Sequence, residues 1–169
     1  LVARIAKSKK YDRVQVDFID GEYANNKTLL PNEVNSNLKM DAHLMIVEKN
    51  LQEYLKDRNK FDRVIVQMES ISNPEDFDCL ALDIHSPIEA IKSYLPKLKL
   101  VNLMSIEPGR GGQELDLKIL EHISYLSNLR YLGDFRVAVD GGIEREHLEK
   151  LESLGVDEVV VGAKRVLSW

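Results

Sequence analysis

Short apolar runs recur along the chain, and segments with helical spacing separate them. A run of four to eight apolar or β-branched residues that ends in a turn is typical of a buried strand, whereas apolar residues three and four apart are typical of a helix. Six runs meet the strand criterion, and a shorter apolar run gives a seventh predicted strand: 14–19, 40–47, 64–68, 80–84, 100–106 and 135–139, then 159–161. Strands that alternate with helices form parallel sheets, so the pattern predicts a parallel α/β fold.

Two of the intervening helices have recognisable ends. Ser86 and the Pro87-Ile88-Glu89 that follows it combine a capping serine, a first-turn proline and a capping-box glutamate, which predicts a helix running to about residue 95. The stripe Leu148, Leu151 and Leu154 predicts a second helix that Gly155 ends. Residues 1–10 resemble the end of another helix. No linker divides the chain, so we expect a single domain over residues 1–169, N-terminally incomplete if a first strand precedes it.

Polar residues gather where the predicted strands end. Asp17 shares one face of the first strand with Gln15 and Ile19, because side chains two residues apart point the same way. A carboxylate on the inner face of a strand is costly unless a metal, a cation or a proton offsets its charge, although capping the next turn is an alternative role. Later strands end in His43, Gln67, Glu69, Asp83, His85, Ser105, Glu107 and Asp140. In a parallel sheet this edge is where sites are built.

Three glycine-bearing turns follow the later strands. The turn at 107–113 is long enough to fold over a ligand, and its Arg110 can reach an anion. Gly141-Gly142 and Gly162-Ala163 each follow a strand directly, so their backbone N–H groups can approach an anion closely. One such turn is more often a tight connection, but two after adjacent strands indicate a phosphate site.

Composition narrows the class of partner. The net charge of −5 argues against nucleic acid or an anionic membrane surface, and no apolar stretch has the length of a membrane span. The single cysteine, Cys79, excludes an intramolecular disulfide and suits a reducing cytoplasm, where we expect the protein and where this thiol would be buried. His122 and His147 fall on predicted helices, and we expect both to face solvent.

Five segments, in chain order, resemble the ribulose-phosphate 3-epimerase family. They are 16–21 (VDFIDG), 41–45 (DAHLM), 104–113 (MSIEPGRGGQ), 139–143 (VDGGI) and 161–163 (VGA). The resemblance implies a TIM (β/α)8 barrel whose first strand is missing or outside the chain shown. It also implies an isomerase of the pentose phosphate pathway that inverts carbon 3 of D-ribulose 5-phosphate to give D-xylulose 5-phosphate.

The resemblance also assigns roles to residues. In the family, one aspartate removes the proton next to the polarised ketone, a second returns it on the other face, and both bind a divalent metal. Asp17 and Asp140 match this pair, and His43 matches a further metal ligand. The matching pocket residues are Met45, Met104, Ser105 and Arg110, and the matching substrate and phosphate contacts are Gly109, Gly111, Gly112, Gly141, Gly142, Gly162 and Ala163.

The departures from the family pattern change the residues expected to bind the metal. Gln15 stands where the family has a metal-binding histidine, and Gln67 replaces another histidine. An amide oxygen ligates weakly, so the set favours Mn²⁺, Fe²⁺ or Mg²⁺ over Zn²⁺, and we expect Mn²⁺, Fe²⁺ or Zn²⁺ as the cofactor.

Three other functions are compatible with the sequence. They are a non-catalytic phosphosugar-binding relative, a 3-epimerase of a hexulose 6-phosphate, and a hexulose-phosphate synthase. The synthase is disfavoured because no lysine stands at a strand end before Lys164. In every case the expected partner is a small sugar phosphate, and a homo-oligomer is compatible with the sequence.

Overall fold

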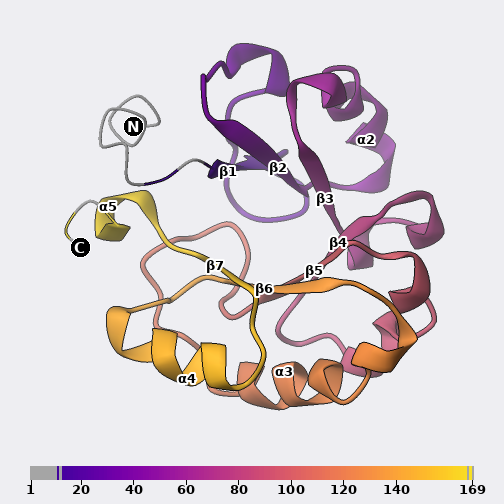
Figure 1. Cartoon of the computed structure of the whole chain (residues 1–169). Coiled ribbons are helices and arrows are strands. Elements are labelled where there is room, and N and C mark those ends of the chain that lie inside the picture. Colours follow the sequence, from indigo (N-terminus) through magenta and orange to yellow (C-terminus); the bar gives the residue numbers. More distant parts are fainter. Residues whose placement is uncertain (1–10, 12, 167, 169) are drawn as a thin grey trace.

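Seven parallel strands form one sheet in which neighbours in sequence are neighbours in space. The computed structural model describes residues 11, 13–166 and 168. The strands curl around a common axis with the helices outside them, which confirms the expected TIM-barrel architecture (Figure 1). Their bounds are β1 (Arg13–Ile19), β2 (Lys39–Met45), β3 (Arg63–Gln67), β4 (Cys79–Leu82), β5 (Leu100–Met104), β6 (Arg136–Asp140) and β7 (Glu158–Val160).

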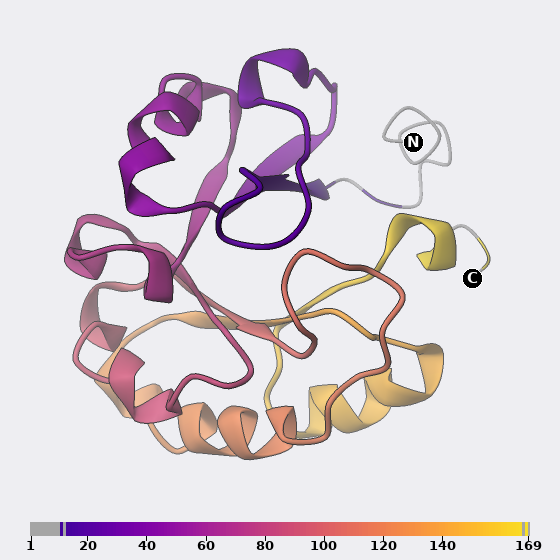
Figure 2. The same cartoon turned by 180° about the vertical axis from the view of Figure 1, so that it is seen from behind.

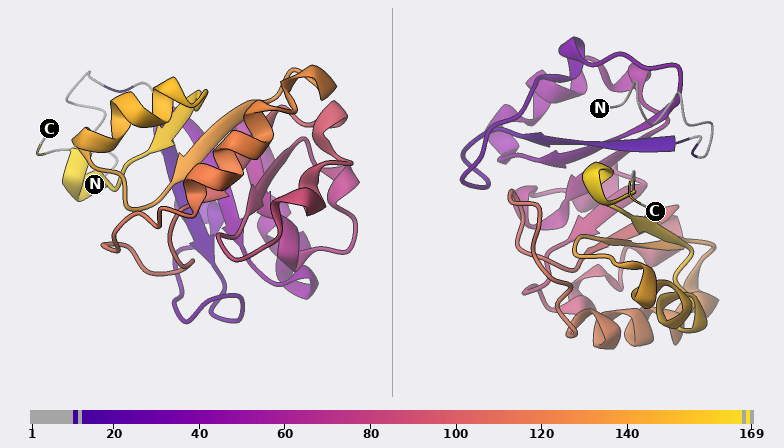
Figure 3. Two further views of the ribbon diagram at one scale, coloured as in Figure 1. Left: turned by 90° about the horizontal axis from the view of Figure 1, so that it is seen from below. Right: turned by 90° about the vertical axis from the view of Figure 1, so that its left-hand side faces the viewer.

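The α-helices are few and short, and 3₁₀ turns make most of the remaining connections. The helices are α2 (Glu48–Leu55), α3 (Ile119–Ser127), α4 (Leu148–Ser153) and α5 (Ala163–Val166). The 3₁₀ turns are η1 (Pro31–Glu33), η2 (Arg58–Lys60), η3 (Met68–Ser70), η4 (Pro74–Asp76), η5 (Ile88–Ile91), η6 (Leu95–Lys97), η7 (Arg130–Leu132) and η8 (Arg145–His147). Helices α3 and α4 cover the outer side of the later strands (Figures 2 and 3).

One predicted helix is replaced by two 3₁₀ turns. The segment after Ser86 forms η5 and η6 instead of one α-helix reaching residue 95. The Ser86 hydroxyl donates to Glu69 Oε1 at 2.5 Å, so it does not cap the segment, and Pro96 lacks a backbone donor. The apolar side chains of both turns are nevertheless buried against the sheet, as the spacing predicts.

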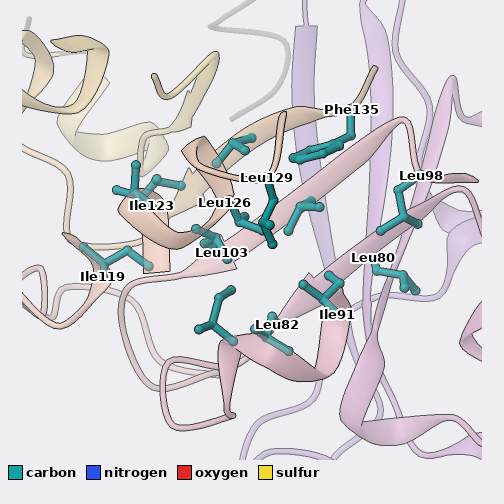
Figure 4. Close-up of a cluster of buried hydrophobic side chains, with 14 of the residues drawn as sticks. Leu80, Leu82, Ile91, Leu98, Leu103, Ile119, Ile123, Leu126, Leu129 and Phe135 are labelled. Carbon is teal, nitrogen blue, oxygen red and sulfur yellow. The ribbon is translucent and has the colours of Figure 1, made fainter. Parts of the chain in front are cut away.

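Alternation along the strands separates an outer core from the barrel interior. On β5, Val101 and Leu103 join the large outer cluster under α3, while Leu100 points into the barrel. Aliphatic side chains and Phe135 make up the buried part of the outer cluster (Figure 4). The interior cluster combines Ile65 and Leu100 with the smaller Ala81, Ala138 and Cys79, which is a buried free thiol as expected.

The expectation for the two helix histidines is wrong for His122. Its ring is buried on α3 against the outer core, with Nδ1 lacking a hydrogen-bond partner among the described residues. The apolar stripe of α3 is wide enough to take in the neighbouring position, which the spacing alone does not reveal. His147 is half-buried and its Nδ1 accepts the backbone N–H of Glu144.

Strands β1 and β7 are the edges of the sheet, and within the described residues no ladder joins them. Charged side chains instead link strands across the barrel floor. Arg63 on β3 donates to Asp41 on β2 at 2.5 Å and to Glu158 on β7 at 2.7 Å, and Arg13 on β1 also pairs with Asp41. The expectation of a helix end at residues 1–10 lies outside the described residues. None of the helices in the described part of the chain is long and apolar enough to cross a bilayer.

Candidate active site

Two carboxylates and one imidazole meet at the carboxyl end of the barrel. Asp17 lies on the inner face of β1, His43 lies on β2 and Asp140 is the last residue of β6. His43 Nδ1 is 3.4 Å from Asp17 Oδ1 and 3.5 Å from Asp140 Oδ2. One ligand atom from each of the three residues lies within 4.8 Å of the others. The parallel register therefore assembles a compact donor set from strands far apart in the sequence.

Gln15 places its amide among these three side chains. Its Nε2 lies 2.9 Å from Asp17 Oδ1, 2.6 Å from Asp140 Oδ2 and 3.3 Å from His43 Nδ1. Gln15 shares the inner face of β1 with Asp17, one pleat deeper in the barrel. The amide thus joins the two acids through one hydrogen bond to each.

The four side chains fit a divalent cation. Ligand atoms that share one cation at about 2.1 Å lie about 3.0 to 3.4 Å from one another. The distances of 2.6 to 3.5 Å between Gln15, His43 and the two carboxylates are close to such edges. Rotation of the Gln15 amide by half a turn places Oε1 at the position of Nε2, which converts a donor into a ligand atom.

Electrostatics couples the members of this group. Burial disfavours charge on His43, but its hydrogen bonds to Asp140 and Asp17 and their negative charges outweigh that effect and raise the pKa of His43 to about 10. Loss of water contact alone would raise the pKa of Asp17, but the hydrogen bond and charge of His43, with help from Gln15, lower it. The site therefore attracts positive charge to the point between its two acids.

Uncharged polar side chains surround the group. Gln67 and Asn102 are both fully buried. Gln67 Oε1 lies 3.1 Å from His43 Nε2, and its Nε2 donates to the Tyr23 hydroxyl at 2.8 Å. Asn102 Nδ2 donates to Asp140 Oδ2 at 3.3 Å, while its Oδ1 has no partner among the described residues.

A cavity of about 920 Å³ runs along the gap between β1 and β7, from the charged residues of the barrel floor to the turns at its mouth, with Asp17 and Asp140 in its wall. Met45 and Met104 line it, as do the turn glycines singled out from the sequence: Gly109, Gly111, Gly112, Gly141, Gly142 and Gly162, with Ala163. Arg110 also lines it and is exposed. His43 is too deeply buried to line the cavity, so it acts on a ligand only through the atoms around it.

The loop at 107–113 reaches across the open end of the barrel toward the turn after β1 (Figure 2). Asn26 Nδ2 donates to the carbonyl of Gly109 at 3.0 Å. A Cβ on Gly109 would come within 2.6 Å of Ala24, so only glycine allows this approach. His85 pairs with Glu107 at 2.5 Å at the other end of the loop. The loop is therefore docked on both sides.

The Gly141-Gly142 turn is held from below. The Ser105 hydroxyl lies 3.0 Å from the carbonyl of Asp140 and 2.6 Å from that of Gly141, so Ser105 supports the turn instead of facing the cavity. Gly142 has φ of 64° and a Cβ there would come within 2.3 Å of the Leu115 backbone. The Ser105 hydrogen bonds and the close Leu115 backbone together fix the backbone of this turn in the cavity wall.

Position at a strand end identified Asp17, His43 and Asp140, and the family resemblance added Gln15; the structure brings the four side chains together. Neither signal identified Asn102 or Tyr23. Asn102 is the one polar residue within the apolar run of β5, which is a detectable signal. Tyr23 lies in a turn, where no periodic pattern reports the direction of a side chain.

Comparisons with known proteins agree with this geometry. The sequence profile described as the ribulose-phosphate 3 epimerase family matches residues 2–166. A ribulose-phosphate 3-epimerase of Helicobacter pylori is 30% identical, with 96% of this chain and 83% of the relative aligned. Enzymes of the same name from Synechocystis (28%, covering 90% and 74%) and Bacillus subtilis (26%, covering 90% and 78%) are also similar.

A similar solved structure supports the fold alone. The tryptophan synthase subunit alpha from Campylobacter jejuni superposes with a TM-score of 0.57 at 11% identity. The match covers 90% of this chain and 75% of that one. At this identity the likeness concerns the arrangement of strands and helices.

Proposed function

The chain belongs to the ribulose-phosphate 3-epimerase family, a family of isomerases, and from this membership and the site geometry we propose that it interconverts D-ribulose 5-phosphate and D-xylulose 5-phosphate. The proposal treats residues 1–169 as one barrel domain. The observation that carries it is the meeting of two carboxylates from β1 and β6 within 4.8 Å of one another.

Inversion at carbon 3 requires a proton to leave one face of the sugar and another to arrive on the opposite face. The C3–H bond lies next to the C2 ketone, so its ionisation gives an enediolate that is planar at carbon 3. Asp17 and Asp140 stand on separate strands and line one cavity, which allows one base on each face. One carboxylate accepts the C3 proton, and the other, already protonated, donates its proton from the opposite side.

The pKa directions suit this exchange. His43 beside Asp17 lowers the pKa of that carboxyl, so Asp17 is ionised and able to accept a proton at neutral pH. Gln15 donates to both carboxylates, and Asn102 donates to Asp140. These contacts hold the oxygens in place, so little reorganisation is needed when the sugar arrives.

A divalent cation is part of the proposal, with Asp17, His43 and Asp140 as ligands and Gln15 contributing Oε1. When bound, such a cation stabilises the negative oxygens of the enediolate. The oxygen-rich set supports Mn²⁺ or Fe²⁺ more than Zn²⁺.

The remaining roles concern binding. The turns at Gly141-Gly142 and Gly162-Ala163 offer backbone N–H groups to the phosphate, and Met45 and Met104 pack against the planar part of the sugar. The loop carrying Gly109, Gly111 and Gly112 excludes water from above, with Arg110 available to the anion.

The proposal is tested by incubating the metal-free protein with D-ribulose 5-phosphate, before and after addition of Mn²⁺, Fe²⁺ or Zn²⁺, and measuring D-xylulose 5-phosphate with a specific coupling enzyme. We expect formation of the epimer that depends on added metal. Folded protein that forms no product with any metal would contradict the proposal. A ketohexose 6-phosphate assayed in parallel decides between five-carbon and six-carbon substrates.

A further inference from the structure

Gln67 connects the buried histidine of the site to a tyrosine above it. Its side chain is fully buried, with Oε1 3.1 Å from His43 Nε2 and Nε2 2.8 Å from the Tyr23 hydroxyl. Both ends of the amide are therefore hydrogen-bonded, the carbonyl oxygen to the His43 ring and the NH₂ group to the Tyr23 hydroxyl.

The tyrosine determines which end of the amide faces the histidine. A phenol oxygen can accept the amide N–H, and the carbonyl end then turns to His43. Gln67 Nε2 donates to the Tyr23 hydroxyl oxygen at 2.8 Å, so this oxygen is the acceptor of the pair. Burial, together with the charges of Glu69 and Asp83, raises the pKa of Tyr23, so the hydroxyl stays neutral.

A carbonyl oxygen can only accept a hydrogen bond, so the ring atom opposite it must carry a hydrogen. His43 is therefore protonated at Nε2, and Nδ1 is the atom that faces Asp17, Asp140 and Gln15. A cation held between the two acids would take the place of the Nδ1 hydrogen, so Nδ1 would be the ligand atom while Nε2 keeps its hydrogen.

Tyr23 is itself held in place. Its backbone N–H donates to Asp20 Oδ1 at 2.9 Å, and Asp20 Oδ2 accepts the Val47 N–H at 2.8 Å and an Asn50 N–H at 3.0 Å. The turn after β1 is thus tied to the start of α2. The hydroxyl reaches Gln67 from an ordered support.

We propose that Tyr23 is a positioning residue for His43, acting through Gln67 to keep a hydrogen on Nε2 and to aim Nδ1 at the two catalytic carboxylates. The consequence for metal affinity rests on the proposed function, whereas the state of the His43 ring does not. A structural role for Gln67, filling a polar space in the barrel, requires no contribution from the Tyr23 hydroxyl.

The test compares Tyr23→Phe, Gln67→Leu and Gln67→Glu with Tyr125→Phe, which removes a hydroxyl from the half-buried Tyr125 on α3, outside the site. The first readout is solvent exchange of the His43 Nε2–H in the metal-free protein by ¹⁵N-histidine NMR, with the signal assigned from His43→Asn. We expect a protected hydrogen in the wild type, Tyr125→Phe and Gln67→Glu. Protection should be lost in Gln67→Leu and reduced at least tenfold in Tyr23→Phe.

The second readout is Mn²⁺ affinity by calorimetry. Partners of metal-bound histidines typically contribute about 10- to 100-fold in affinity, so we expect about 10-fold weaker binding in Tyr23→Phe and more in Gln67→Leu. Gln67→Glu keeps an acceptor at Nε2 and should bind within a few-fold of wild type. Thermal melts confirm that each variant is folded.

The two proposals fail separately. Folded Tyr23→Phe with wild-type exchange at His43 would overturn the positioning role, whatever the enzyme does with metal. If Tyr23→Phe loses Nε2–H protection while the wild-type protein neither binds Mn²⁺ nor forms product, the positioning role stands and the proposed function is contradicted.

Discussion

The outer core and the barrel mouth are built from the same strands, but the outer core is formed by apolar side chains and the mouth by polar ones. On β5, Val101 and Leu103 face outward into a cluster of apolar side chains, whereas Asn102 faces inward to Asp140. On β6, Val139 faces outward and Asp140 inward. Buried polar residues on the strands lie on the inner face: Asp41, His43, Gln67, Asn102 and Asp140.

The difference shows what each face contributes. Burial of an apolar side chain is favourable by about 1.5 to 3 kcal/mol, so the outer face stabilises the fold. A buried polar group is costly unless it is hydrogen-bonded, so a polar cluster on the inner face needs internal partners or a ligand. The contacts around Gln15 and Gln67 supply those partners. Variants on the outer face should therefore change stability, and variants on the inner face should change activity.

The largest effect is expected from Asp140→Asn. The amide keeps the shape of the carboxylate but cannot transfer the proton, so kcat should fall by about 10³-fold. Stability should change less than activity, because the amide Oδ1 can still accept from Gln15 and Asn102 and the charge of Asp17 remains beside His43. The measurement is steady-state epimerisation together with a thermal melt. A loss of activity matched by unfolding at the assay temperature would assign Asp140 to the fold.

Leu103→Ala should have the opposite effect, which is a loss of stability without a loss of activity. Leu103 is fully buried in the outer core, and truncation of such a leucine costs about 2 to 5 kcal/mol. Urea unfolding should show this loss, while kcat/KM of the folded fraction stays close to wild type. A large fall in kcat/KM without loss of stability would mean that the outer core also sets the geometry of the site.

Sequence pattern was sufficient to place the strands and the acids at their ends, since both are local features of one strand, whereas the roles of the acids came from the family resemblance. It was insufficient for the segment after Ser86, whose hydroxyl is engaged by Glu69, a partner 17 residues away. It was also insufficient for His122, because spacing does not report how wide the buried stripe of a short helix is. Tyr23 and Asn102 depend on contacts between distant strands and turns, which pattern does not contain.

The buried His122 should make the free energy of unfolding depend on pH. Burial, followed by the charge of Lys118, lowers the pKa of His122 below that of an unfolded histidine, about 6.5. The unfolded chain therefore binds the proton more readily, and the free energy of unfolding falls as pH drops below about 6.5, by up to about 1.4 kcal/mol per unit. His122→Leu should flatten this part of the curve in chemical unfolding. An unchanged slope would place the effect on other groups.

The smallest effect is expected at the loop docking contact. His85 and Glu107 are both well exposed, and exposed pairs contribute less than about 1 kcal/mol. Glu107→Gln should raise KM by no more than about fivefold and leave stability unchanged. A fall in turnover by about two orders of magnitude, the range of a lost acid or base, would instead assign Glu107 a direct part in the reaction.

The most direct test of the two-carboxylate mechanism is solvent exchange at carbon 3. Each epimer is incubated in D₂O with Asp17→Asn or Asp140→Asn, and loss of the C3 proton signal is followed by NMR. A variant that keeps one base should exchange the proton of one epimer without inverting it, and the two variants should act on opposite epimers. Exchange of the same epimer by both variants, or continued inversion in either, would contradict a mechanism with one carboxylate on each face.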